Sequence, residues 1–131
     1  MQASIAENLK DLRQQIAVAC DKCGRSPDEI TILAVTKTFP AEIIREAVAI
    51  GLTEIGDSRV QEAEAKFAEL GHLGRYHLIG HLQSNKVKKA VQLFDVIQAV
   101  DSFPLAKEIS HRAGELGKTV ECLVEINSSG E

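Results

Sequence analysis

The sequence predicts an α/β protein built on a parallel β-sheet. Short apolar runs rich in β-branched residues alternate with helices of roughly ten to thirteen residues, in which apolar side chains recur every three or four positions. Glycine, proline and serine mark most of the junctions, so the connections are short. Strands that alternate with helices in this way form right-handed βαβ units, whose strands run parallel.

The first helix is amphipathic and begins at a recognisable cap. Ser4 and Glu7 have the spacing of a capping box, and Gly24 marks the end of the helix. One apolar stripe follows its length at spacings of four, three and four, and it consists of Ile5, Leu9, Leu12 and Ile16. A short capped turn over 26–29 then leads into an apolar run from Thr31 to Lys37, which predicts a strand buried on both faces.

Four further helix–strand units follow in the same order. Pro40 begins a helix with Ile43, Ile44, Ala47, Val48 and Ile50 on its buried side, and Gly51 ends it. Ser84 and Ser102 are the expected N-caps of two later helices. The expected helices after the first span 40–50, 58–70, 84–93 and 102–116, and the expected strands span 31–37, 54–56, 76–79, 95–100 and 119–126.

Periodicity alone does not decide how the five strands are arranged. A doubly wound sheet of five strands could close its own core at 131 residues. A complete (β/α)₈ barrel typically needs about 250 residues. No low-complexity linker divides the chain, so we treat residues 1–131 as a single domain.

The charge balance and apolar patterning exclude several classes of protein. Nineteen acidic and fifteen basic residues give a net charge of −4, which argues against binding to nucleic acid or an anionic membrane. No apolar run approaches the roughly eighteen residues of a membrane helix, and the start of the chain lacks a signal-peptide pattern. Three cysteines, an odd number, do not suggest a disulfide framework. We therefore expect a cytoplasmic protein.

Two patterns suggest metal ligands, and neither supplies a full site. Cys20 and Cys23 have zinc-ligand spacing, but the chain has no second pair. His77 and His81 are four residues apart, yet Gly80 lies between them and the segment predicts a strand rather than a helix. Phosphate-loop and nucleophile-elbow motifs are absent from the sequence. The basic cluster of Lys86, Lys88 and Lys89 predicts a solvated helix face, with contact to a small anion or partner as the alternative.

A candidate site comes from the ends of the predicted strands. In a parallel sheet the carboxyl ends converge on one rim, which here carries Lys37, 56–58, 79–81, 101–102 and 127–130. Lysine, hydroxyl, glycine and amide groups suit a polar planar ligand. A lysine among apolar walls has a lowered pKa, and its neutral amine can form a Schiff base with an aldehyde. The alternative interpretation is that these are ordinary turn and cap residues.

Several blocks of sequence resemble one known family. They are Ala34-Val-Thr-Lys-Thr38, Gly56-Asp-Ser-Arg-Val-Gln-Glu62, His77-Leu-Ile-Gly-His-Leu-Gln-Ser-Asn-Lys86, Val100-Asp-Ser102 and Val124-Glu-Ile-Asn-Ser-Ser-Gly-Glu131. Together they are similar to the pyridoxal phosphate homeostasis protein family, and the third block is the most specific. The resemblance implies a fold similar to the alanine racemase N-terminal domain, a parallel (β/α) barrel of TIM type. It implies that this chain forms a partial barrel of about five strands.

The resemblance also implies a cofactor and a role. Lys37 matches the lysine that forms a Schiff base with pyridoxal 5′-phosphate (PLP), and the residues implied to line or approach the ring are Ser58, His77, Ile79 and Ser102. Proteins of this family are regarded as buffering or delivering PLP without robust catalysis of their own. One alternative is a PLP-dependent racemase-type enzyme with Lys37 as catalytic base. Another is a regulatory scaffold that acts through its exposed helices.

The chain departs from the family pattern at two points. Gly56-Asp57-Ser58 stands where the family usually reads Gly-Glu-Asn, so the shorter Ser58 replaces an asparagine. The resemblance covers only the N-terminal half of the family, and the loops after strands seven and eight, which commonly hold the phosphate, lie beyond this chain. A five-strand arc leaves two open sheet edges, so we also expect self-association.

Overall fold

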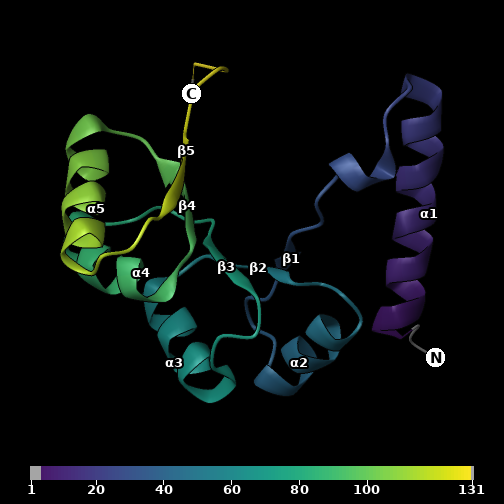
Figure 1. Cartoon of the computed structure of the whole chain (residues 1–131), viewed down its shortest axis with the longest axis horizontal. Coiled ribbons are helices and arrows are strands. Elements are labelled where there is room, and N and C mark those ends of the chain that lie inside the picture. Colours follow the sequence, from purple (N-terminus) through teal and green to yellow (C-terminus); the bar gives the residue numbers. More distant parts are fainter. Residues whose placement is uncertain (1–3, 131) are drawn as a thin grey trace.

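The computed structural model describes residues 4–130, which contain one five-stranded parallel sheet. The strands lie side by side in sequence order, and they are β1 (Ala34–Val35), β2 (Glu54–Asp57), β3 (Arg75–Leu78), β4 (Val96–Val100) and β5 (Glu121–Val124). Figure 1 shows that they form an arc. A doubly wound sheet reverses direction at a switch point, whereas this order never does. The arrangement confirms the predicted partial barrel.

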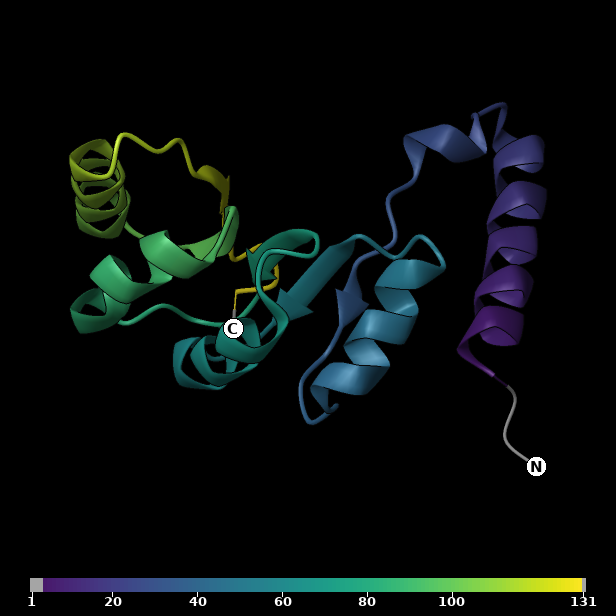
Figure 2. The ribbon, with the colours of Figure 1, turned by 60° about the horizontal axis from the view of Figure 1, so that its bottom comes forward.

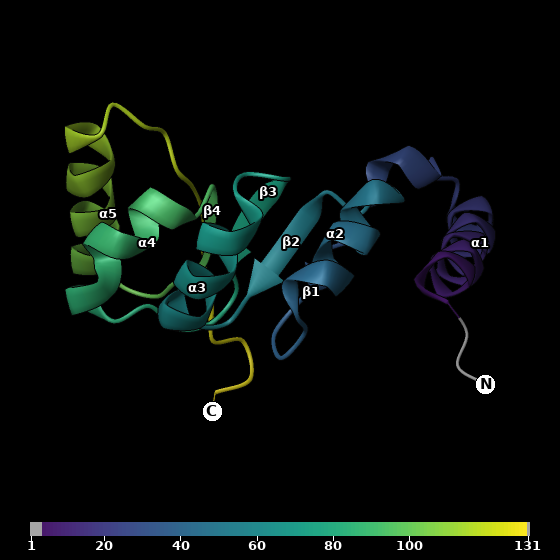
Figure 3. The ribbon, with the colours of Figure 1, turned by 90° about the horizontal axis from the view of Figure 1, so that it is seen from below.

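Four helices follow the outer side of the arc. These are α2 (Ala41–Ala49), α3 (Val60–Leu70), α4 (Val87–Leu93) and α5 (Phe103–Glu115). In Figure 3, which views the molecule from below, α2, α3 and α4 lie in front of the strands. The first helix, α1 (Ile5–Cys23), stands at one end beside α2, and Figure 2 shows it joined to the sheet by the segment that contains the 3₁₀ turn η1 (Pro27–Glu29).

The predicted caps explain where several helices begin and end. The Ser4 hydroxyl accepts a hydrogen bond from the Glu7 backbone N–H at 3.1 Å, and the Glu7 carboxylate accepts one from the Ser4 N–H at 3.2 Å, which completes the capping box. Gly24 ends α1 at φ 72°, a left-handed conformation that glycine adopts without steric cost. The Ser102 hydroxyl accepts from the Leu105 N–H at 3.3 Å and so begins α5.

The core lies between the helices and the convex face of the sheet. Ile55, Leu78 and Ile97 project from β2, β3 and β4 and are at most 1% exposed. The rings of Phe67 on α3 and Tyr76 on β3 stack with centroids 3.8 Å apart. Because side chains alternate along a strand, the residues between these core positions face the concave side of the arc. That side carries the candidate site.

The two edge strands are shorter and more exposed than predicted. β1 covers only two residues of the expected strand 31–37, and the Val35 side chain is 44% exposed rather than buried. β5 covers 121–124 of the expected 119–126, and all four residues are exposed. Among the described strands, each edge strand pairs with one neighbour only. The prediction of burial on both faces, made for the strand 31–37, was therefore wrong.

Two predicted helix starts also need correction. Ser84 lies inside the 3₁₀ turn η2 (Ser84–Lys86), so it does not cap α4, which begins at Val87. The helix expected from Ser58 begins at Val60, because Ser58 lies in a bend after β2 and Arg59 is extended. Between residues 4 and 130, no helix combines the length and the apolar character that crossing a membrane requires.

Candidate functional site

Three predicted site residues follow the carboxyl ends of neighbouring strands. In the sheet register, Gly56 on β2 pairs with Val35 on β1 and with His77 on β3. Two residues after Val35, Gly56 and His77 come Lys37, Ser58 and Ile79. The pairing continues to Ile79, whose N–H donates to the Asp57 carbonyl, whereas a turn begins at Thr36, so Lys37 lies just beyond the paired part of β1.

Two glycines bring the backbone and side chains of this rim close together. A Cβ atom on Gly56 would lie 3.3 Å from side-chain carbons of both Leu33 and Ile79, so the missing side chain lets these apolar groups close over the strand. A Cβ atom on Gly80 would lie 2.3 Å from the Ser58 carbonyl oxygen, closer than any side chain tolerates. Gly80 therefore fixes the approach of the chain after β3 to Ser58.

Lys37 lies in a tight turn directly after β1. The Phe39 N–H donates to the Thr36 carbonyl at 3.1 Å and closes the turn, while the Thr36 hydroxyl and N–H both donate to the Gly56 carbonyl. Thr38 has φ 69°, an unusual conformation for a β-branched residue. The Lys37 side chain is exposed rather than held among apolar walls.

A second lysine, Lys66 on α3, holds the turn from behind. Its ammonium donates to the Thr36 carbonyl at 2.6 Å and to the Asp57 carboxylate at 3.1 Å, and it lies 3.3 Å from Glu62. Glu62 in turn accepts a hydrogen bond from the Thr38 N–H at 3.0 Å. That hydrogen bond, followed by the one from Lys66, lowers the pKa of Glu62 below its ordinary value.

Sequence reasoning missed this pair and misplaced Asp57. Glu62 and Lys66 are four residues apart on one helix, a spacing that signals an ion pair but not its link to Thr36, thirty residues away. Asp57 was expected among the rim groups, yet its side chain is 1% exposed and faces α3. The alternation along β2 could have revealed this, because Ile55 and Asp57 must share a face.

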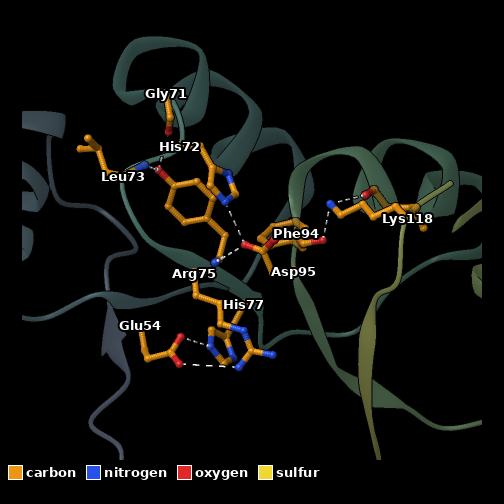
Figure 4. Close-up of polar contacts among 11 residues, drawn as sticks. Glu54, Gly71, His72, Leu73, Arg75, His77, Phe94, Asp95 and Lys118 are labelled. Carbon is orange, nitrogen blue, oxygen red and sulfur yellow. Dashed lines mark hydrogen bonds and ion pairs between the residues drawn. The ribbon is translucent and has the colours of Figure 1, made fainter. Parts of the chain in front are cut away.

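His77 lies on the concave face, one row below Ile79, and both of its ring nitrogens are engaged. Nε2 lies 2.9 Å from the Glu54 carboxylate, and Nδ1 lies 3.1 Å from the Gln98 amide nitrogen. Because the amide nitrogen can only donate, Nδ1 accepts and Nε2–H donates to Glu54. Arg75 also pairs with Glu54, as Figure 4 shows. His77 therefore links β2, β3 and β4 below Ile79.

Figure 4 also shows the contacts that fix the amino ends of β3 and β4. The Asp95 carboxylate accepts from the Tyr76 N–H at 2.9 Å, and Lys118 donates to the carbonyls of Val91 and Phe94 at the end of α4. The Tyr76 hydroxyl donates to the Gly71 carbonyl and accepts from the Leu73 N–H. Burial of this phenol raises the pKa of Tyr76.

Ser102 lies further along the rim, after β4. It borders a pocket of about 250 Å³ whose lining also includes His81, Ser84 and Asp101 but not Lys37. The His81 imidazole lies 3.6 Å from the Asp101 carboxylate. The structure thus places Lys37, Ser58 and Ile79 just after three adjacent strands and Ser102 apart from them. A larger pocket of about 570 Å³ lies near η1, with Arg13, Asp28 and Glu54 in its lining.

The other sequence patterns occupy separate places. Cys20 is buried in α1 and Cys23 is exposed, while Lys88 and Lys89 are exposed on α4. Lys89 pairs with Glu64 on α3 at 3.1 Å. Within residues 4–130, no group of three or more His, Cys, Asp or Glu side chains is arranged to hold a metal ion.

Comparison with known proteins identifies relatives of this arrangement. Residues 4–131 match the family described as alanine racemase, N-terminal domain. The chain is 42% identical over 132 residues to the pyridoxal phosphate homeostasis protein of Escherichia coli (strain K12), covering 97% of this chain and 56% of that protein. It is 36% identical to the protein of the same name from Vibrio alginolyticus, covering 98% of this chain and 58% of that protein.

Solved structures agree with the sequence relatives. PipY of Synechococcus elongatus PCC7942, solved with PLP bound, is 43% identical and superposes with a TM-score of 0.83, covering 95% of this chain and 55% of PipY. A protein of Bifidobacterium adolescentis superposes with a TM-score of 0.88 at 37% identity, covering 97% of this chain and 56% of that protein. The chain thus spans about half the length of the relatives it matches.

Proposed function

The chain belongs to the alanine racemase N-terminal domain family, and from that premise we propose that it binds PLP as a Schiff base on Lys37 and serves PLP homeostasis. One observation carries the proposal. Lys37 is an exposed lysine in a turn at the carboxyl end of a barrel strand, and Ser58 and Ile79 follow the ends of the next two strands of the sheet. The carboxyl rim is where barrels of this type gather their reactive groups.

The residues present fit the cofactor's chemistry. The unprotonated Lys37 amine would hold PLP by condensing with its aldehyde, with loss of one water molecule. Ile79 and Leu33, closed together over Gly56, offer an apolar surface to a planar ring. The Ser58 hydroxyl offers a hydrogen-bonding group after the neighbouring strand. PLP itself supplies the electron-withdrawing chemistry, while the protein positions it.

The other two predicted residues take indirect parts in this proposal. Both ring nitrogens of His77 are hydrogen-bonded to protein groups. We therefore propose that His77 holds the strands together below Ile79 and offers no free polar group to the cofactor. The Ser102 hydroxyl oxygen accepts the capping bond of α5. We propose that its hydroxyl hydrogen faces the rim pocket that Asp101 also borders.

The test is to trap and locate the adduct. The protein is incubated with PLP, reduced with borohydride and digested, and the modified peptide is identified by mass spectrometry. We expect the adduct on the peptide that contains Lys37, and we expect it to disappear in Lys37→Ala but to persist in Lys86→Ala, a control at another rim-side lysine. An adduct pattern unchanged in Lys37→Ala would refute the proposal. Chiral analysis of alanine after incubation with PLP tests the racemase-type alternative.

A further inference from the structure

We propose that Glu62 and Lys66 are positioning residues that hold the Lys37 turn in the conformation that presents the lysine amine to PLP. The inference rests on the proposed attachment of PLP to Lys37, and it adds two residues of α3 to that site. Neither residue lies on the rim itself. Both act through the backbone on either side of Lys37.

The contacts on the two sides of Lys37 are complementary. Lys66 donates to the carbonyl of Thr36, the residue before Lys37, at 2.6 Å. Glu62 accepts from the N–H of Thr38, the residue after it, at 3.0 Å. The two side chains also lie 3.3 Å from each other. One ion pair on α3 therefore forms hydrogen bonds with both peptide groups that flank Lys37.

The conformation of the turn depends on contacts that hold Thr38 in place. Thr38 has φ 69°, and it is the only non-glycine residue with positive φ between residues 4 and 130. A β-branched residue adopts this region only where the surroundings impose it. The Glu62 carboxylate bonds to the N–H of that same residue. Without the bond, the turn can relax to an extended conformation and redirect the Lys37 side chain.

Lys66 is fixed in place from below. Its side chain is 12% exposed, and Asp57, buried to 1% exposure at the end of β2, accepts its second hydrogen bond at 3.1 Å. The sheet thus orients Lys66, Lys66 orients Glu62, and both orient the turn. The hydrogen bonds from Thr38 and Lys66 both favour the ionised carboxylate of Glu62, and they lower its pKa.

The test compares Glu62→Ala, Glu62→Gln and the control Glu64→Ala in the full chain. Glu62 is 33% exposed, so its loss leaves the core intact, and Glu64 is an exposed carboxylate on the same helix. Two quantities are measured at neutral pH. Hydrogen exchange of the Thr38 amide is followed by NMR without PLP, and the rate of borohydride-trapped adduct at Lys37 is followed with PLP below saturation.

We expect Glu62→Ala to speed Thr38 exchange roughly tenfold and to slow trapping at Lys37 severalfold. Glu62→Gln retains an acceptor oxygen, so its Thr38 exchange and its trapping rate at Lys37 should both lie close to those of the wild type. Glu64→Ala should change neither rate. Faster Thr38 exchange with unchanged trapping would overturn the positioning role, as would unchanged exchange. If the wild-type chain forms no adduct at Lys37, the proposed function fails, and Thr38 exchange alone then decides whether Glu62 holds the turn.

Discussion

Replacing Lys66 with methionine should destabilise the chain strongly, because it leaves the buried Asp57 carboxylate without its ion-pair partner. Asp57 is 1% exposed, and after the change its remaining hydrogen bond is the one from the Ser58 N–H at 2.8 Å. Removing one partner of a buried ion pair costs about 3–5 kcal/mol. Since Lys66 is itself 12% exposed, some water reaches the pair, and we expect the lower value, about 3 kcal/mol of unfolding free energy.

Urea denaturation followed by circular dichroism measures this loss. With a typical slope of 1–3 kcal/mol per molar, the midpoint should fall by about 1–3 M. The matched control is Lys89→Met, which breaks an ion pair to Glu64 whose side chains are 45% and 48% exposed and should cost less than about 1 kcal/mol. Adding Asp57→Asn to Lys66→Met should restore part of the loss, because no buried charge remains. Equal small effects at Lys66 and Lys89 would refute the reasoning.

Three further predictions concern other parts of the molecule. Tyr76 is the only tyrosine, so its ionisation can be followed by ultraviolet absorbance, and we expect a midpoint above the ordinary 10.0. Because the pKa of Tyr76 is raised in the folded state, its contribution to stability is complete below the pKa of the unfolded state and is lost as pH rises through the pKa of the folded state. A titration midpoint at or below 10 would contradict the burial of the phenol. Gly80→Ala should destabilise by about 1–3 kcal/mol through its clash with the Ser58 carbonyl, whereas Gly114→Ala in α5, with open space around it, should stabilise by up to about 1 kcal/mol in thermal melts. The open edges at β1 and β5 should make the chain self-associate, and a monodisperse monomer in sedimentation velocity at all concentrations would contradict this expectation.

Local signals in the sequence predicted the architecture well. The capping box at Ser4 and Glu7, the cap at Ser102 and the stop at Gly24 are encoded within four residues of where they act. The alternation of apolar strands and amphipathic helices indicated a parallel sheet. Strand order needed more than periodicity, and it was the family resemblance that predicted the barrel arc that the structure has.

Features that depend on distant contacts were less accessible. The apolar run up to Lys37 indicates burial, but burial depends on what covers a face, and Val35 in this run is 44% exposed. The sequence shows Lys66 only as a lysine on a predicted helix. Its contact with Thr36, thirty residues away, depends on the fold. Asp57 could have been placed correctly from the alternation of β2. That Lys37, Ser58 and Ile79 follow three neighbouring strands could be seen only from the order of strands in the sheet.

The distribution of a reduced PLP adduct among the chain's nine lysines tests the central claim most directly. The measurement uses PLP at less than one equivalent, borohydride reduction and quantitative peptide mapping. Non-specific reaction of a soluble aldehyde spreads over exposed lysines such as Lys88 and Lys89. If Lys37 is the attachment site, most of the adduct should lie on Lys37 alone. An even spread over the exposed lysines, with no preference for Lys37, would contradict the claim.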